Sequence, residues 1–284
     1  MPLSDVTIDA ANRAIREVFE TSSVAWRTIP HWETGDPAQT AVRADTVFEA
    51  PFPPDAFPPP QPAPGPFGAA SRPILTLRQP FLTSYAQATA PTADQVVAGA
   101  TTVASYLAEA LDRAIGPVLE AASATSIDLN HADGGDFDDA GAGTPPVAKL
   151  LEAREAVEKA GLHSPRAVWA SPKYMAAFHR SNGPDLILQA IAQVLEMSTI
   201  DGVATLKGGA GFTQGALLIG RRQVIAPGRA YEYAPGPEPV DIAVAVPPSL
   251  EIVGDNAAGE VELAVRLRYA LRVKDARGLV LWRN

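Results

Sequence analysis

The sequence of 284 residues contains no cysteine, and it contains no lysine before Lys149. The absence of cysteine excludes disulfide bonds, thiolate nucleophiles and cysteine-ligated metal sites. Arginine therefore carries the positive charge of the N-terminal half.

Charge and long apolar runs are also scarce. Charged residues make up 19% of the chain, and 23 basic against 32 acidic residues give a formal net charge of −9. The longest basic run is Arg221-Arg222, which argues against sequence-specific DNA binding. No apolar run reaches the roughly 18 residues that a membrane helix needs. The N-terminus lacks the pattern of a secretory signal, so we expect a cytoplasmic protein with no membrane partner.

The N-terminal region predicts a helix followed by an irregular arm. Apolar residues recur over 5–20 with the three-four spacing of one helix face. Residues 22–45 then carry Trp26 and Trp32 without a regular period. Because large rings need a surface that covers them, we expect an arm that lies on a neighbouring subunit. Removal of residues 1–45 should then leave a soluble chain that does not assemble or that misassembles.

A proline-rich segment follows the arm. Residues 51–66 contain nine prolines, which fix φ and lack an amide donor, so the segment is neither helix nor central strand. We expect a stiff projecting loop between strands at 46–49 and 74–85. Aromatic residues dominate interface energetics, so those of the arm and loop are candidate interface anchors. The candidates are Trp26, Trp32, Phe48, Phe52, Phe57 and Phe67.

The longest helical period covers residues 92–122 and predicts a helix of roughly 40–45 Å. Thr92 and Gln95 form a capping-box pattern at its start. Gly116-Pro117 predicts a bend or break near its end.

The remaining chain predicts a mixed block and one long strand. After an acidic, glycine-rich loop over 123–143, we expect helices over 144–160, 171–180 and 185–196 and strands over 166–170, 216–220, 222–226 and 240–246. Residues 261–274 alternate strictly between apolar and other residues, which predicts a strand as long as the helix over 92–122. We expect the two to pack side by side as a rigid spine.

Candidate chemical motifs favour ordinary structural interpretations. The acidic cluster Asp133, Asp136, Asp138 and Asp139 offers oxygen ligands, but its spacing does not match a calcium-binding loop. Residues 208–215 are glycine-rich without a dinucleotide fingerprint. The four histidines lack metal-ligand spacing. We therefore expect no catalytic, cofactor or metal site, although an enzyme that uses His179 with a distant carboxylate stays an alternative.

The order of these elements resembles the Hong Kong 97-type capsid fold of tailed bacteriophages, which encapsulin shell proteins share. The similar segments are RPILTLRQPFLTSYAQ with AEALDRAIG, SPRAVWASPKYMAAFHR, QGALLIGRRQVIAPGRAYEY and VELAVRLRYALRVKDARGLVLW. The resemblance implies an α+β fold with five parts. They are an N-terminal arm (1–45), an extended loop (46–83), a peripheral domain with the spine helix (84–122), an axial domain (123–255), and the long strand and tail of the peripheral domain (256–284).

The resemblance also implies a structural role rather than an enzymatic one. The subunit of such a fold assembles with copies of itself, as hexamers and pentamers, into an icosahedral phage head in the host bacterial cytoplasm. Further implied partners are a portal and packaged double-stranded DNA, bound without sequence specificity. The lysine–asparagine cross-links of the founding phage are excluded here, because the loop contains no lysine. No long cleavable segment precedes the arm, so we expect a separate scaffolding protein.

Two alternatives remain at this level. The chain is also compatible with an encapsulin nanocompartment that encloses an enzyme cargo, in which the first helix would bind a cargo peptide. An unrelated enzyme or binding module is the alternative of another class. The basic residues Arg221-Arg222, Arg266, Arg268, Arg272 and Lys274 either face packaged DNA or pair with acidic residues across subunit interfaces. The negative net charge favours the second interpretation.

Overall fold

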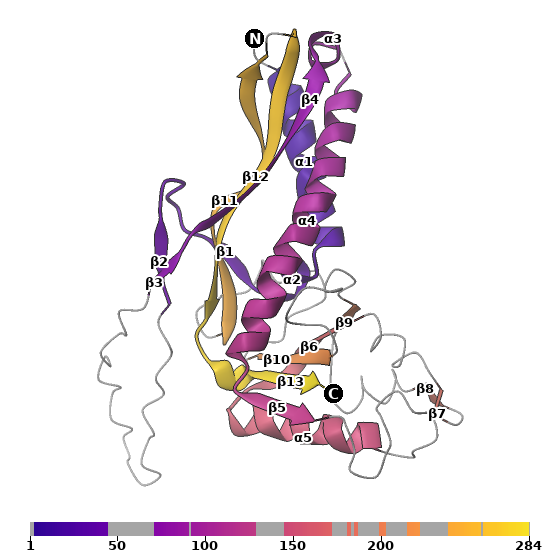
Figure 1. Ribbon diagram of the computed structural model, residues 1–284, viewed down its shortest axis with the longest axis vertical. Coiled ribbons are helices and arrows are strands. Elements are labelled where there is room, and N and C mark those ends of the chain that lie inside the picture. The colour runs from indigo at the N-terminus through magenta and orange to yellow at the C-terminus, as the bar shows by residue number, and fades with distance from the viewer. Residues whose placement is uncertain are drawn as a thin grey trace.

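The computed structural model describes residues 3–44, 71–90, 92–128, 145–171, 181–182, 185–186, 199–202, 215–221, 238–256 and 258–283. Figure 1 shows an elongated molecule in which two long helices and several long strands run beside one another. A second sheet lies at one end, together with the C-terminus. The expected α+β class is confirmed.

A four-stranded sheet with the order β1-β11-β12-β4 forms the long part of the molecule. Strands β11 and β4 are each antiparallel to β12, and the short β1 is parallel to β11. Apolar residues of β12, from Val261 to Tyr269, are buried at every second position, which confirms the predicted strand. The bounds are His31–Glu33 for β1, Leu75–Ser84 for β4, Val240–Asp255 for β11 and Glu260–Val273 for β12.

Two helices, α1 (Asp5–Ser22) and α4 (Asp94–Ala122), pack against this sheet and complete its core. Helix α4 has 29 residues and so spans about 43 Å. It lies so close to β4 that a Cβ atom added at Gly99 would be 2.8 Å from the ring of Phe81. The predicted packing of this helix beside the strand over 261–274 is confirmed, because buried residues of α4 and β12 share one core (Figure 1).

The predicted start of α4 was wrong. Its N-cap is Ala93, which makes no side-chain capping bond, and the capping box lies instead at Ser84 and Gln87, where α3 (Tyr85–Ala88) begins. The helix also continues through Pro117 to its end, so the predicted break is absent and a bend there stays a prediction. The buried residues Ile115 and Leu119 pack into the core on either side of the proline, which holds the last turns in place.

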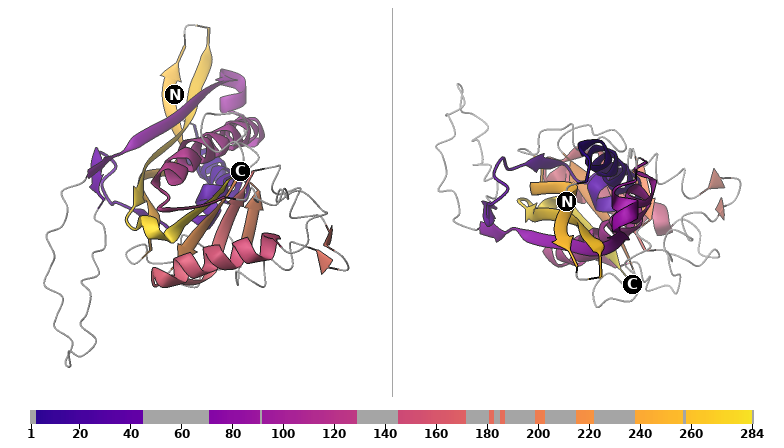
Figure 2. Two further views of the ribbon diagram at one scale, coloured as in Figure 1. Left: turned by 60° about the horizontal axis from the view of Figure 1, so that its bottom comes forward. Right: turned by 90° about the horizontal axis from the view of Figure 1, so that it is seen from above.

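The second sheet has five strands in the order β5-β13-β10-β6-β9. Helix α5 (Pro145–Lys159) lies along it, as the left view of Figure 2 shows. The strands are Thr125–Asp128 (β5), His163–Ala170 (β6), Thr199–Gly202 (β9), Gly215–Arg221 (β10) and Leu279–Arg283 (β13). Smaller elements are β2 (Ala41–Arg43), β3 (Ser71–Pro73), β7 (Ser181–Asn182), β8 (Asp185–Leu186), the helix α2 (Val24–Thr28) and the 3-10 turn η3 (Ala276–Gly278).

The strand pairings cross two of the expected domain boundaries, and the domain division itself stays a prediction. Strand β11 falls within the range 123–255, yet it joins β12 in the four-stranded sheet. Strand β13 falls within 256–284, yet it pairs with β10 and β5 in the second sheet. A tight turn at Asn256 connects β11 directly to β12, so the two strands form one hairpin and cannot belong to separate sheets.

Other predictions have mixed outcomes. The helix over 144–160 and the strands over 166–170, 216–220 and 240–246 are confirmed. The first two residues of the predicted helix over 185–196 instead form strand β8, which pairs with β7. Three further predictions concern segments outside the described residues. They are the acidic loop, the helix over 171–180 beyond its first residue, and the strand over 222–226.

Candidate assembly interface

A small antiparallel ladder flanks the proline-rich segment. Strand β2 pairs with β3, so that Arg43 lies opposite Ser71 on either side of residues 45–70. Val42 is buried against Ala243 and Ala270, and Trp32 packs against the same cluster. This ladder, β2 with β3, is called the root of the excursion below. The root is attached to the four-stranded sheet by apolar packing. The predicted strand over 74–85 is confirmed as β4, and the predicted strand over 46–49 lies outside the described residues.

Arginines of β12 hold the root by its main chain. Arg268 donates hydrogen bonds to the carbonyl oxygens of Pro37 and Gln39, the latter at 2.9 Å. Arg272 donates to the carbonyl oxygen of Arg43 at 3.2 Å. The expectation was that these arginines face DNA or pair with acidic residues across subunit interfaces. The bonds described here go to the same chain, and both alternatives stay predictions. The guanidinium groups lie next to exposed carbonyl groups of their own chain, and both groups gain a partner.

A buried ion cluster fixes the position of Arg272. Its Nε and Nη2 atoms lie 2.6 and 2.7 Å from the two carboxylate oxygens of Asp241, whose side chain is fully buried. Lys274 reaches the same carboxylate at 2.8 Å. Burial lowers the pKa of Lys274, and the charge of Asp241 partly opposes that shift. The Arg272 guanidinium also lies 4.9 Å from the centre of the Trp32 ring, a cation–π distance.

A single buried carboxylate ties the N-terminal region to the spine helix. Asp112 of α4 accepts hydrogen bonds from the Ser23 hydroxyl at 2.7 Å and from the amides of Val24 and Ala25, each at 2.9 Å. These donors form the N-terminus of α2, where a negative charge is favoured. Burial raises the pKa of Asp112 to about 6, although the hydrogen bonds and the charge of Arg27 act in the opposite direction.

Helix α2 is held from the second sheet as well. Trp169 of β6 donates its indole N–H to the Thr28 hydroxyl at 2.9 Å, and Arg221 of β10 donates to the Thr28 carbonyl. Residues 22–44 are therefore part of the body at the junction of the two sheets. The prediction of an irregular arm was wrong. This segment is ordered by contacts with α4, β6 and β10, which are distant in sequence, so its local periodicity gave no sign of structure.

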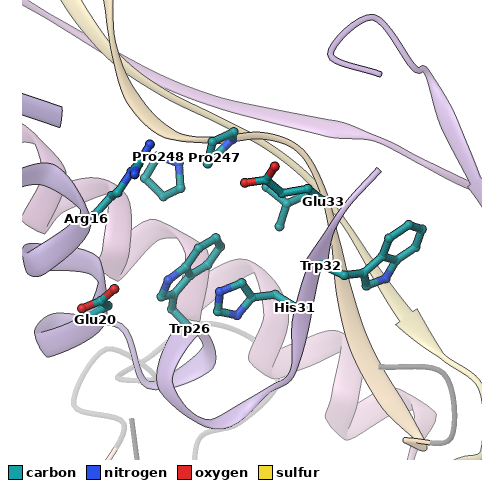
Figure 3. Close-up of a pocket in the computed structure, with 9 residues that line it drawn as sticks. Arg16, Glu20, Trp26, His31, Trp32, Glu33, Pro247 and Pro248 are labelled. Carbon is teal, nitrogen blue, oxygen red and sulfur yellow. The ribbon is translucent and has the colours of Figure 1, made fainter. Parts of the chain in front are cut away.

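A pocket of about 360 Å³ lies between α1, β1 and β11. In Figure 3 the rings of Trp26 and His31 lie side by side, and their centres are 4.0 Å apart. Burial lowers the pKa of His31 to about 4, so the ring is neutral at pH 7. The other lining groups are carboxylates, an arginine and apolar residues. These include Arg16, Glu20, Glu33, Val244, Pro247 and Pro248. This lining offers no hydroxyl or amine nucleophile beside the imidazole, so it suits binding better than covalent catalysis.

Strand β4 forms an exposed edge of the four-stranded sheet. Among the described strands it pairs only with β12, and several of its apolar side chains face water. Leu75 is 52% exposed and Leu82 55% exposed, and Tyr106 of α4 is 63% exposed. Exposed edges and apolar side chains are typical of surfaces that another chain covers.

Comparison with known proteins adds a fold assignment. No protein-family model and no curated protein sequence matches the chain. A phage-related protein from Bordetella bronchiseptica superposes with a TM-score of 0.67 at 12% identity, over 99% of this chain and 97% of that one. A virus-like particle from Pyrococcus furiosus gives a TM-score of 0.64 at 14% identity, over 97% and 99%. The capsid of an empty GTA particle gives 0.57 at 13% identity, over 93% and 96%.

The chain has the Hong Kong 97-type capsid fold. The similarity extends over nearly the whole chain, so the capsid fold accounts for both sheets and for the spine helix. At these levels of identity the likeness establishes the fold alone.

The predicted interface anchors of this capsid fold lie in different places. Trp26 is only 8% exposed and packs edge-to-face with Phe19 in the core of its own chain, so it needs no neighbour to cover it. Trp32 is half-buried beside the root. The other four anchors, Phe48, Phe52, Phe57 and Phe67, lie outside the described residues. The interface role of all six stays a prediction.

Sequence reasoning missed Asp112 and the residues that hold the root. A signal for Asp112 was present, because it is a lone acidic residue on the buried face of an otherwise apolar helix. The described residues contain no cluster of three or more histidine or acidic side chains that is suited to a metal ion. Within that part of the chain, no helix has the length and apolar character of a membrane span.

Proposed function

We propose that the chain is the major subunit of a self-assembling icosahedral phage head that encloses DNA. The anchoring of the root is the observation that carries this proposal. Two arginines of β12 hold residues 37–43 by three hydrogen bonds, and a buried ion cluster fixes one of those arginines. A loop that only connects two strands needs no such support. Such support suits a loop that contacts a neighbouring copy.

The exposed surface supports the same role. Heterologous contacts that close on themselves build rings and shells from one kind of chain. The β4 edge and its apolar side chains provide such a contact surface on every copy. The proposed partners are therefore copies of this chain, arranged as hexamers and pentamers. A separate scaffolding protein, a portal and DNA bound through its phosphates complete the proposal, which assigns the chain to the virion capsid after assembly in the bacterial cytoplasm.

Four of the basic residues first considered for DNA contact are engaged within the chain. Arg266, Arg268, Arg272 and Lys274 all have partners within the chain. A negatively charged subunit is expected to contact DNA weakly and without sequence preference. Such a shell is compatible with DNA that is driven in by a packaging motor rather than drawn in by affinity for the subunit.

A second candidate function is a nanocompartment shell with a protein cargo. The pocket under α1 favours it, because an aromatic and proline-lined pocket next to the first helix offers a place for a cargo peptide. The similarity to a virus-like particle from Pyrococcus furiosus adds support. We propose no catalytic role in either case.

Electron microscopy of the purified protein tests the proposal, combined with nuclease digestion. A phage head subunit is expected to form closed particles, and co-production with its packaging partners is expected to yield DNA that nuclease cannot reach. Closed particles that hold a co-purifying protein instead of DNA would support the second candidate. A monomeric protein without particles would exclude both.

A further inference from the structure

The pocket between α1, β1 and β11 has an aromatic wall of fixed orientation. The Trp26 ring packs edge-to-face with Phe19, at 5.8 Å between ring centres, and stacks on His31 at 4.0 Å. The amide of Trp26 also donates a hydrogen bond of 3.1 Å to the Ser23 hydroxyl at the start of α2. In Figure 3 the indole points into the space that the labelled residues surround. A ligand that enters this pocket therefore meets an aromatic surface that is already ordered.

The backbone of β11 builds another wall of the pocket. Strand β1 pairs with a short stretch of β11, and the register of β11 against β12 shifts between Val246 and Ser249. Pro247 and Pro248 lie at this irregularity, and proline has no N–H group with which to continue a ladder. The two prolines therefore give the pocket an apolar side that another strand does not close. The volume of about 360 Å³ suits a small organic molecule.

Three charged side chains line the pocket and are exposed. They are Arg16 and Glu20 of α1 and Glu33 of β1. None of the three makes a side-chain hydrogen bond or an ion pair with the described part of the chain. Arg16 precedes Glu20 by about one turn, yet in Figure 3 its guanidinium group points toward Pro248 rather than toward Glu20. His31 is neutral at pH 7 because burial lowers its pKa to about 4, so one arginine and two glutamates leave a net charge of −1.

This combination favours a positively charged organic group. Aromatic rings attract cations through their quadrupole, and the attraction grows where water is partly excluded. An anion would face two carboxylates and a single guanidinium group. A metal ion would need several oxygen ligands, and the described residues contain no cluster of three or more histidine or acidic side chains that could hold one. Rings and prolines suit the apolar body of an organic ligand instead.

We infer that this pocket binds a small organic cation that carries one ammonium or guanidinium group on a flat apolar body. Glu20 and Glu33 attract the charged end of the ligand. Trp26 and the two prolines of β11 cover its apolar end. The inference adds a ligand site to the chain, and it does not depend on the proposed shell function.

Binding of phenylethylamine to the purified full-length chain tests the inference. A titration followed by the NMR signals of the ligand gives the dissociation constant for a single chain and for a particle alike. Three related probes separate the contributions. Phenylethanol keeps the ring without the charge, phenylpropionate reverses the charge, and ethylamine keeps the charge without the ring. Phenylethylamine is expected to bind about tenfold more tightly than each of the three, or more.

The same titration can overturn the inference. Equal binding of phenylethanol would show that the apolar walls act alone, and equal binding of phenylpropionate would show that Arg16 controls the pocket. Equal binding of ethylamine would show that the rings contribute nothing. Each of these results, or no binding of phenylethylamine, would contradict the proposed site.

Substitution of the exposed charges gives a second, independent readout. Glu20→Gln and Glu33→Gln are each expected to weaken phenylethylamine binding by about threefold to tenfold, and Arg16→Gln is expected to strengthen it, since a repelling charge is removed. Glu17→Gln is the matched control, because Glu17 is exposed on α1 but does not line the pocket. Equal weakening by Glu17→Gln and Glu20→Gln would show attraction to the charge of the whole chain and would contradict the inference.

Discussion

Arg272 binds Asp241 through two parallel hydrogen bonds of 2.6 and 2.7 Å, and its remaining bond, of 3.2 Å, reaches the carbonyl of Arg43 at the root of the excursion. One guanidinium group thus connects the core of the four-stranded sheet to the loop that we propose for assembly. The bidentate pair orients the third donor, because the planar guanidinium group fixes all its N–H directions at once.

Removal of this guanidinium group should destabilise the subunit. Arg272→Ala leaves the buried Asp241 with Lys274 as its remaining cation, so we expect the free energy of unfolding to fall by about 3 kcal/mol. Arg272→Lys should recover only part of that loss, since an amine cannot make the bidentate contact. Arg266→Ala, in a partly exposed pair with Glu251, should cost at most about 1 kcal/mol. Urea denaturation of dissociated subunits measures all three, and equal losses for Arg272→Ala and Arg266→Ala would contradict the assigned role.

Arg268 should control the mobility of the root rather than the stability of the body. Its two hydrogen bonds end on carbonyl groups of the exposed segment before β2. Arg268→Ala is expected to raise the rate of tryptic cleavage after Arg43 by about tenfold, through easier local opening. Arg266→Ala is the control, because its described bond goes to Glu251. Peptide mass spectrometry over a digestion time course gives both rates, and an unchanged rate in Arg268→Ala would exclude the anchor.

Much of this architecture follows from periodicity in the sequence. The alternation over 261–274 and the helical spacing over 92–122 predict β12 and α4 because each pattern reflects one face against a common core. The resemblance of their order to a capsid subunit then leads to the correct fold. Neither step depends on contacts between residues far apart in the sequence.

The parts that failed depend on such contacts. The segment 22–45 has no period of its own and is ordered by Asp112, Trp169 and Arg221, which follow it by about 90 to 190 residues. The same contacts change the expected effect of removing residues 1–45. Because Ile15, Phe19 and Trp26 belong to the core, the truncated chain should unfold rather than stay soluble and unassembled.

Two buried groups should give opposing dependences of stability on pH. The pKa of Asp112 is raised from 3.8 to about 6, so the folded state binds the proton more tightly, and this group lowers the free energy of unfolding as the pH rises from about 4 to 6. The pKa of His31 is lowered from 6.5 to about 4, so the unfolded state binds its proton more tightly, and this group raises the free energy of unfolding over a similar range. The two contributions largely cancel.

Single substitutions should expose each contribution. Relative to the unaltered chain, Asp112→Asn should make stability rise more steeply between pH 4 and 6, and His31→Phe should make it rise less steeply or fall. Each change in slope approaches 1.4 kcal/mol per pH unit at most, which corresponds to one proton. Denaturation curves at half-unit steps of pH measure the slopes, and parallel curves for all three proteins would contradict the assignment of both groups.

The contact between α4 and β4 offers a test of packing. A methyl group at Gly99 would be 2.8 and 2.9 Å from atoms of the Phe81 ring, so Gly99→Ala should destabilise the subunit by about 1–2 kcal/mol in spite of its better helix propensity. In a Phe81→Leu background the same change should be neutral or stabilising, since the ring is gone. A double-mutant cycle by thermal or urea unfolding measures the coupling, and additive effects would show that the helix and strand do not pack as described.

The proposal that the chain assembles with itself into a closed shell is tested most directly by the mass of the purified protein in solution. Sedimentation velocity over a range of protein concentrations is expected to show one fast species whose mass is a large fixed multiple of 29.8 kDa. A species of 29.8 kDa that persists at every concentration and salt condition would contradict the proposal.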